Sequence, residues 1–361
     1  MPSAEVVDTP EEAAEQELPP LIVRRPLEAF LDERDLGSGE IEVERIGEGH
    51  SNLTFLVKRG DRRLVLRRPP RPPLPPSAHD VLREARLLAA VQGARVRVPR
   101  VVTVCDDESL LGVPFYVMEE VEGTVVTDSL PPALDRPAER ERLGYELVDA
   151  LAEIHAVDWR ACGLEGFGKP SGYLERQLRR FTGLWEHNKT RDVPRVEELR
   201  DWLAGNMPES PPATIVHGDY RLGNVMVADD APARIVAIFD WELSTIGDPL
   251  ADVGYLTATW TERDDPPETM WSSPDAVTRL EGFPTRAELL ARYEERTGRS
   301  MSDQRWYQTL ALWKAAVFME GNFKRFSAGT TDDPYLELFD EGVPALAEKA
   351  WEVAHAPAAT T

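Results

Sequence analysis

The residues best suited to chemistry lie in one stretch, His217-Gly218-Asp219-Tyr220-Arg221-Leu222-Gly223-Asn224, and at Asp240, sixteen residues further on. Phosphoryl transfer needs a carboxylate that accepts a proton from the attacking hydroxyl, oxygen ligands for Mg²⁺, and cations near the phosphate. Asp219 could be that base, and Asn224 with Asp240 could hold the metal, which takes one or two carboxylates plus phosphate oxygens. Each of the three could instead be a turn or capping residue. Their joint spacing favours the metal-dependent chemistry.

Strand-like runs at 214–216, 224–227 and 234–239 must position these residues. Asp219 follows the first run, and Asp240 ends the third, so we expect both carboxylates at one edge of a small sheet. His217 is expected to be a hydrogen-bonded structural residue rather than a catalytic one. Asp252, which opens the next helical segment, is expected to cap that helix or brace the loop that carries Asp219.

Near the N-terminus, apolar and polar residues alternate over 41–46, 53–58 and 63–67, the pattern of an antiparallel meander. The loop between the first two runs carries residues suited to phosphate binding, through backbone N–H groups and two polar side chains. The loop lacks the third glycine of a Gly-x-Gly-x-x-Gly motif, and a plain hairpin turn is the alternative. The loop residues are Gly47, Gly49, Ser51 and Asn52.

The remaining pattern divides the chain into two lobes. Six prolines in residues 69–76 predict a stiff connector, followed by a helix over 78–92 and strands at 101–104 and 114–118. Beyond them, apolar residues recur at helical spacing over 143–154, 174–185 and 306–317. We therefore predict an α+β protein with four parts. They are an acidic disordered tail over 1–25, an N-lobe over 26–119, a hinge over 120–123 and a helical C-lobe over 124–361.

Composition limits the possible partners. The 361 residues carry a formal charge of −23, which disfavours binding to a nucleic-acid backbone. No run approaches the about 18 apolar residues of a membrane span, and the first twenty residues lack the pattern of a signal peptide. With only two cysteines, a disulfide scaffold is excluded. These features predict a cytoplasmic protein that binds neither nucleic acid nor membrane.

The stretches HGDYRLGN and FDWELSTIGDP resemble the aminoglycoside phosphotransferase and choline kinase superfamily, relatives of the protein kinases. The resemblance runs from about residue 40 to about residue 330. VLRRPP and SAHDVLREARLL resemble the branch associated with acyl-CoA dehydrogenases. The resemblance implies a bilobal protein-kinase-like fold, with a small antiparallel-sheet N-lobe containing one main helix and a larger, mostly helical C-lobe. It also implies Mg²⁺ with ATP or GTP as phosphoryl donor.

The resemblance assigns further residues to nucleotide binding. Val65 and Arg67 share one face of a strand, so Val65 would cover the adenine and Arg67 would bind the α- and β-phosphates. Arg67 stands where protein kinases have lysine, so its fork would bind with different geometry. Lys58 is a rival for this role, and Arg67 could instead be a solvated strand charge. Glu84 is the expected ion-pair partner of Arg67, with an exposed helical Glu as the alternative.

By the same resemblance, Glu119 and Val121 would offer backbone groups to the edge of the adenine. Arg221 lies two residues after Asp219, where protein kinases place a lysine that faces the γ-phosphate. We expect Arg221 to stabilise charge in the transition state. A salt bridge between Arg221 and an acid of the helical lobe is the alternative.

The phosphoryl acceptor is expected to be a hydroxyl of a small molecule. An acidic lobe would suit a cationic aminoglycoside or choline, whereas the family branch implies a hydroxyacyl-CoA or a related metabolite. A polyanionic CoA would need a basic patch, for which the sequence offers Arg176, Arg179 and Arg180, or Lys324 and Arg325. The rival from another class is a nucleotide-binding scaffold without catalysis, which Arg67 and the incomplete glycine loop favour and the Asp219, Asn224 and Asp240 set disfavours.

Overall fold

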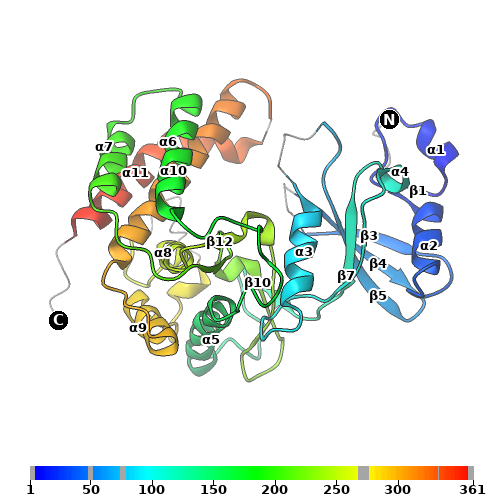
Figure 1. Ribbon diagram of the computed structural model, residues 1–361, viewed down its shortest axis with the longest axis horizontal. Helices are drawn as coiled ribbons and strands as arrows, with labels where there is room; N and C mark the ends of the chain where they lie inside the picture. The colour runs from blue at the N-terminus through cyan, green and yellow to red at the C-terminus, as the bar shows by residue number, and fades with distance from the viewer. Residues whose placement is uncertain (1–4, 48–51, 74–78, 267–275, 332, 357–361) are drawn as a thin grey trace. The chain divides into compact units, whose positions relative to one another are not determined.

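The computed structural model describes residues 5–47, 52–73, 79–266, 276–331 and 333–356. The chain divides into two compact units (Figure 1). Unit 1 comprises residues 1–94 and 98–122, and unit 2 comprises residues 95–97 and 123–361. The division after Glu122 falls within the segment 120–123 that was predicted to be a hinge. Within the described ranges, no helix has the length and hydropathy needed to cross a membrane.

Unit 1 is built on a five-stranded antiparallel sheet with the order β3-β4-β5-β7-β6. The predicted meander is confirmed by the pairing of β3 with β4 and of β4 with β5. The predicted helix after the proline run is α3, which begins at Val81 behind an Asp80 cap. The elements of the sheet and this helix are β3 (Glu42–Ile46), β4 (Leu53–Arg59), β5 (Arg62–Arg68), α3 (Val81–Val91), β6 (Val101–Cys105) and β7 (Phe115–Glu119).

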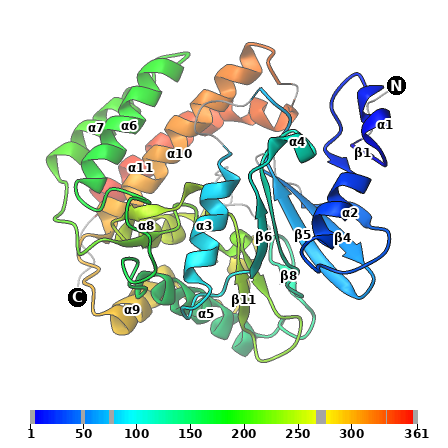
Figure 2. The ribbon, with the colours of Figure 1, turned by 45° about the vertical axis from the view of Figure 1, so that its right-hand side comes forward.

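The segment 5–25, expected to be part of a disordered tail, instead folds against the sheet of unit 1. Leu21 and Ile22 are fully buried in the same apolar cluster as Phe55. The buried guanidinium of Arg68 donates a hydrogen bond to the carbonyl of Leu21. Val7, Leu21, Ile22 and Val23 therefore anchor a segment that also carries several exposed acidic residues, which is why composition alone gave the wrong expectation. Figure 2 shows α2 (Arg24–Asp32) beside β4, with β1 (Val6–Val7) and α1 (Pro10–Ala14) next to α2. The other short elements of unit 1 are β2 (Ile22–Val23) and α4 (Glu108–Leu111).

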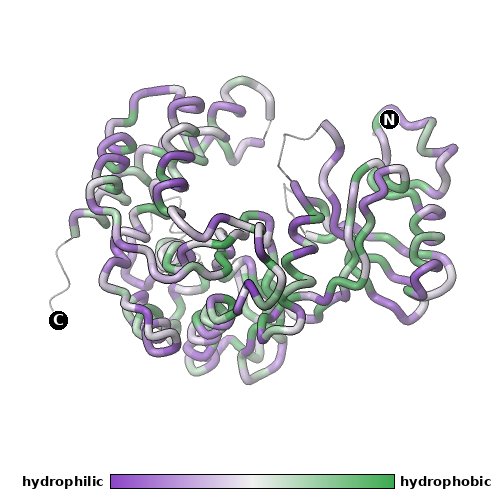
Figure 3. Tube along the Cα trace, in the orientation of Figure 1, coloured by the Kyte–Doolittle hydropathy of each residue, from purple (hydrophilic) through white to green (hydrophobic). Residues whose placement is uncertain are grey.

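Unit 2 is mostly helical, as the periodicity predicts. Its long helices bury a stripe of apolar residues and expose polar ones, and Figure 3 shows the alternation of hydrophobic and hydrophilic residues along them. The 24-residue α10 packs against α6, α7, α8 and α11 and forms the centre of the unit. The helices are α5 (Pro137–His155), α6 (Tyr173–Asn188), α7 (Pro194–Gly205), α8 (Leu250–Thr259), α9 (Arg286–Thr297), α10 (Gln304–Ser327) and α11 (Phe339–His355).

Two small sheets lie among these helices and position the chemistry. The predicted strands are present as β9 (Thr214–Val216), β10 (Val225–Val227) and β11 (Ile235–Ile238). They do not form one sheet, because β9 pairs with β12 (Thr245–Gly247), whereas β10 pairs with β11 and with β8 (Thr124–Val125). The segment from β9 to α8 therefore crosses from one sheet to the other and back, carrying Asp219, Asn224 and Asp240 with it.

Candidate functional site

Asp219 follows β9 and is held by Asn224 at the end of the short 3₁₀ helix η1 (Leu222–Asn224). The Nδ2 of Asn224 donates to the carbonyl oxygen of Asp219 at 2.7 Å and to its Oδ2 at 2.8 Å. Because both bonds use the amide nitrogen, the amide oxygen of Asn224 points away from the carboxylate. The five-residue spacing predicted from sequence thus produces a direct side-chain contact.

Asp252 of α8 holds the backbone of the loop that follows β9 and carries Asp219. Its Oδ2 accepts a hydrogen bond from the N–H of His217 at 2.7 Å, and its Oδ1 accepts one from Gly218 at 2.8 Å. The Nε2 of the buried His155 lies 3.2 Å from the same carboxylate. Burial alone would raise the pKa of Asp252, but these hydrogen bonds and the nearby histidines lower it, so the carboxylate stays ionised. The expectation of a brace under the loop is confirmed.

His217 is a spacer, as expected. Its ring is fully buried, its Nδ1 accepts the N–H of Asp219 at 3.2 Å, and its Nε2 lies 2.8 Å from the carbonyl of Phe239. An Nδ1 that accepts leaves the proton on Nε2, which donates to Phe239. His217 thereby ties the loop after β9 to the end of β11. Gly218, with a φ of +91°, also needs its hydrogen, because a Cβ there would lie 2.9 Å from the carbonyl oxygen of Leu243.

Asp240 lies two residues after β11 in a left-handed conformation, with a φ of +63°. Such a backbone costs free energy in a residue other than glycine and is concentrated at functional sites. The N–H of Phe239, the residue before Asp240, donates to the carbonyl of Asn224 at 2.8 Å. This bond holds the backbone next to Asp240 beside the backbone of Asn224, the other proposed metal ligand. One carboxylate and one amide oxygen fit Mg²⁺ that is also bound by nucleotide phosphates.

Arg221 lies beside Asp219 rather than against an acid elsewhere in unit 2. Its Nε is 3.7 Å from Asp219 Oδ1, and almost half of its side-chain surface is exposed. Tyr255 of α8 hydrogen-bonds to the same carboxylate. Burial, together with the negative charge of Asp219, raises the pKa of Tyr255 well above its usual value, so the phenol donates its proton to Asp219.

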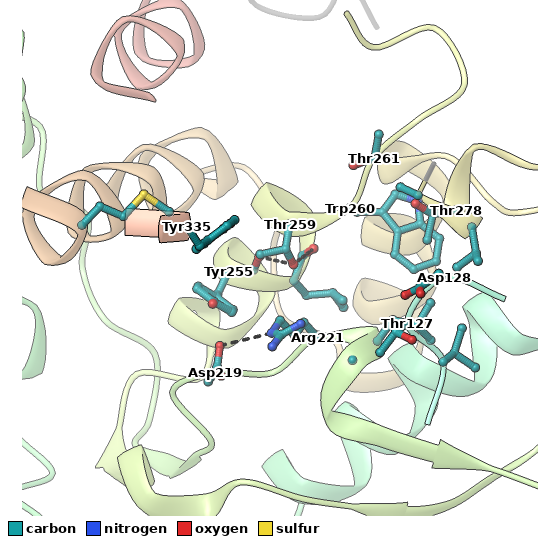
Figure 4. Close-up of a pocket in the computed structure, with 17 residues that line it drawn as sticks. Thr127, Asp128, Asp219, Arg221, Tyr255, Thr259, Trp260, Thr261, Thr278 and Tyr335 are labelled. Atoms are coloured by element: carbon teal, nitrogen blue, oxygen red, sulfur yellow. Dashed lines mark hydrogen bonds and ion pairs between the residues drawn. The ribbon is translucent and has the colours of Figure 1, made fainter. Parts of the chain in front are cut away.

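A pocket of about 730 Å³ opens beside Asp219, and unit 2 supplies every residue of its wall. Figure 4 shows Asp219, Arg221 and Tyr255 at one end and Thr127, Asp128 and Thr278 at the other. The wall between them alternates apolar surface with hydroxyl groups, which suits a small molecule that carries its own hydroxyls. The remaining residues of the wall are Val126, Leu222, Gly223, Leu256, Thr259, Trp260, Thr261, Ala276, Val277, Met319 and Tyr335.

In unit 1, Arg67 makes the ion pair that was expected of it. Its Nε donates to Glu84 Oε2 of α3 at 2.9 Å, and its Nη1 donates to Thr54 Oγ1 at 3.2 Å. The Glu84 side chain is only 2% exposed, so the alternative of an exposed helical Glu is wrong. Val65 lies two residues before Arg67 on the same face of β5, opposite Leu56 and Met118 of the neighbouring strands. Lys58 instead lies near Glu44, 4.0 Å away.

Other residues predicted to bind the nucleotide are described only in part. Gly47 has a φ of +75°, and Asn52 is buried at the start of β4. Gly49 and Ser51 lie outside the described residues. The N–H of Glu119 is bonded to the carbonyl of Arg100, so of this residue's backbone groups only the carbonyl is left for an adenine. Val121 follows in the segment after β7 and is half-buried.

Sequence reasoning missed Tyr255 and the wall of the pocket. The signal for Tyr255 was present, because Tyr255 lies three residues after Asp252 and therefore on nearly the same side of α8. The pocket carried no such signal. Its wall comes from segments more than two hundred residues apart, from Val126 to Tyr335, which only the tertiary fold brings together.

Residues 42–310 match the model of the phosphotransferase enzyme family, and the chain belongs to that family. The chain is 34% identical over 318 residues to acyl-CoA dehydrogenase family member 10 of Mus musculus. This match covers 88% of the chain but only 30% of the mouse protein, so the chain spans less than a third of that relative.

Solved structures share the fold. A candidate aminoglycoside phosphotransferase from Ralstonia eutropha is 33% identical, with a TM-score of 0.79 over 91% of this chain and 97% of that one. Aminoglycoside phosphotransferase APH(4)-Ia, solved with AMP-PNP and hygromycin B, has a TM-score of 0.60 at 18% identity, over 93% of this chain and all of that one. The second likeness concerns the fold alone. The predicted family and α+β kinase-like fold are thus confirmed.

Proposed function

We propose that the protein transfers the γ-phosphoryl group of ATP or GTP to a hydroxyl group of a small molecule. The observation that carries this proposal is the Asp219 carboxylate, which is held by Asn224 and Tyr255 at the wall of a pocket lined with hydroxyl groups. Membership of the phosphotransferase family supports it. The solved relative that holds AMP-PNP together with hygromycin B is consistent with this class of reaction.

Each residue has one part in this reaction. Asp219 accepts the proton of the acceptor hydroxyl as its oxygen bonds to the γ-phosphorus and the bond to the β-phosphate oxygen breaks, which releases the nucleoside diphosphate. Arg221 stabilises the charge on the transferred group, and Arg67 binds the α- and β-phosphates. Asn224 and Asp240 would hold Mg²⁺, which neutralises charge on the phosphates when bound.

We propose a hydroxyacyl-CoA or a related hydroxylated acid as the acceptor. The mouse relative is named for acyl-CoA dehydrogenase activity, and this chain corresponds to under a third of its length. A kinase joined to such an enzyme would modify a hydroxyl on the same kind of substrate. The alternative acceptors, choline and aminoglycosides, are cations that the acidic chain would attract.

A thermal-shift titration tests the nucleotide and metal parts of the proposal. ATP and GTP are added with and without Mg²⁺ to wild type, to Asp240→Ala and to the control Asp230→Ala, whose side chain pairs with Arg234 on the surface. At a hundredfold excess over Kd, a ligand of the native state adds about 2.7 kcal/mol of stability. We expect a Mg²⁺-dependent shift in wild type and the control that Asp240→Ala lacks. No shift with either nucleotide would contradict the proposal. A shift without release or transfer of phosphate would instead support the alternative of a nucleotide-binding scaffold without catalysis.

A further inference from the structure

Two cations of unit 2 flank one aromatic ring. The ammonium of Lys314 on α10 lies 4.8 Å from the ring centre of Phe181, and the guanidinium carbon of Arg180 lies 6.0 Å from it. Phe181 and Arg180 belong to α6, which runs beside α10 in both ribbon views (Figures 1 and 2). Within the ranges that the structure describes, neither cation has a carboxylate or carbonyl partner.

This arrangement is costly for a purely structural role. The two like charges repel each other, and the ring offsets only part of the cost of removing Lys314 from water. Burial first, and then the charge of Arg180, lower the pKa of Lys314 to about 8. Acidic residues are abundant in this chain, and Arg191 beside the same helix is paired with Glu320. Arg180 is exposed to solvent, whereas Lys314 is only partly exposed and has no anionic partner among the described residues. Lys314 is therefore the cation that an anion of a ligand would stabilise.

The pair lies close enough to the proposed catalytic site to act on its substrate. The charges of Asp219 and Asp252 both act on Lys314, in the direction that favours its protonated form. Met319, five residues further along α10, lines the pocket that contains Asp219. The pocket wall carries two carboxylates, Asp128 and Asp219, and one cation, Arg221. Lys314 and Arg180 supply further positive charge outside that wall, where they would attract an anionic group that extends beyond it.

We propose that Arg180 and Lys314 bind an anionic group of the phosphoryl acceptor, a carboxylate or a phosphate, while the acceptor hydroxyl lies at Asp219. This inference rests on the proposed function and narrows it to acceptors that carry negative charge. A free hydroxy acid would present its carboxylate, and a CoA thioester would present its phosphates. Both are planar or tetrahedral oxyanions that suit a lysine and an arginine acting together.

The test compares Lys314→Met and Arg180→Gln with the control Arg179→Gln, the next residue on α6, which makes no contact with the ring of Phe181 in the described structure. Binding of CoA, a hydroxyacyl-CoA, the free hydroxy acid and its methyl ester is measured by calorimetry without nucleotide. Turnover of the three hydroxylated probes is then measured with ATP and Mg²⁺. For the anionic acceptor, we expect KM to rise roughly tenfold to a hundredfold in either variant, as is usual for losing a bond between charged groups.

We expect kcat for the anionic acceptor to be the same in both variants as in wild type. Binding and turnover of the methyl ester should also be unchanged. Loss of CoA binding in the variants identifies phosphate as the bound group, and loss of free-acid binding alone identifies the carboxylate. The inference is wrong if the variants bind every anionic probe as wild type does, or if Arg179→Gln has the same effect. Failure of the proposed function can be told apart from failure of this inference. If the proposed function is wrong, nucleotides will cause no thermal shift and no phosphoryl group will be transferred, but the calorimetric binding of the anionic probes can still be compared between wild type and variants.

Discussion

Arg67 and Glu84 form an ion pair of 2.9 Å that joins the middle strand of the sheet of unit 1 to helix α3. A second nitrogen of the same guanidinium bonds to Thr54 on the adjacent strand. A lysine has a single nitrogen on a flexible stem and could not reproduce this fork. The direction of the Arg67 side chain is therefore set by two partners.

We expect Glu84→Gln to weaken the stabilisation of the protein by ATP. Removing the buried carboxylate leaves the Arg67 charge without its partner, which costs about 3 kcal/mol of folding free energy when a buried pair is broken. Chemical denaturation measures the loss of stability, and the ATP-dependent thermal shift measures the loss of binding. The surface variant Glu44→Gln is the control. An unchanged ATP shift in a folded Glu84→Gln protein would show that the pair is structural only.

Asp219→Asn should bind nucleotide as wild type does and lose turnover by roughly 100-fold to 10,000-fold, the range for loss of a general base. The amide preserves the size of the side chain but cannot accept the proton. Phosphoryl transfer and the ATP thermal shift are measured on the same samples, with Asp230→Asn as the exposed control. Turnover within a few-fold of wild type would assign the base elsewhere.

Acid should destabilise the loop that carries Asp219 through His155 and Asp252. Burial, only partly opposed by Asp252, lowers the pKa of His155 below 6.5, so the folded protein holds this ring neutral. Because the unfolded chain binds a proton there more readily, stability falls as the pH drops below about 6.5. The lowered pKa of Asp252 removes further stability below about pH 4.

The melting temperature of wild type from pH 8 to pH 5 measures this effect, and His155→Gln separates its source. We expect the variant to be less stable at pH 8, because Gln cannot reproduce the bonds to Asp252 and Tyr293. We also expect a smaller loss of its stability between pH 7 and pH 5. An identical pH dependence in both proteins would show that other groups cause the acid sensitivity.

Lys314→Met should raise the melting temperature at pH 7. The folded pKa of about 8 lies below the usual 10.5, so protonation of this lysine opposes folding at neutral pH. Met fills the same volume without charge, and the gain is on the order of 1 kcal/mol. The gain should shrink as the pH rises from 8 toward 10.5, and a loss of stability at pH 7 would contradict this account.

The KM for an anionic acceptor should also rise in wild type between pH 7 and pH 9, as Lys314 loses its proton. Arg180 of α6 favours that loss, and Asp219 and Asp252 oppose it. In Lys314→Arg the charge persists at every pH, so the rise should disappear. Steady-state kinetics at fixed saturating ATP provides the measurement, and a methyl ester, which carries no carboxylate, is the control acceptor.

Most strands and helices, and the central residues of the candidate site, were predicted from patterns within short stretches of sequence. Alternation identified β3, β4 and β5. The spacing singled out Asp219 and Asn224, which the structure brings into contact, although the sequence predicted Asn224 only as a metal ligand. Each of these signals lies within a few consecutive residues. The pairing of β9 with β12 instead of β10 could not be read in this way, because strands of three residues carry too little pattern to specify their neighbours.

Lys314 illustrates a second limit. On α10 it occupies a position within an otherwise apolar run, Ala311-Leu312-Trp313 before it and Ala315-Ala316-Val317 after it. Sequence cannot tell whether such a lysine extends to water or remains buried, because its long stem permits both. Only the packing of α6 against α10 decides the outcome, and it places Phe181 under the ammonium.

The folding of residues 5–32 onto the sheet has a practical consequence for shortened versions of this protein. The match to the family begins at residue 42, which invites expression from that point. Such a protein would lack Leu21, Ile22, Leu27 and Leu31, which are fully buried against the sheet. It would also lack the carbonyl of Leu21, one of the carbonyls to which the buried Arg68 donates. The boundary of the shared family region is therefore not the boundary of the folding unit, and a sheet stripped on one face would be prone to aggregate.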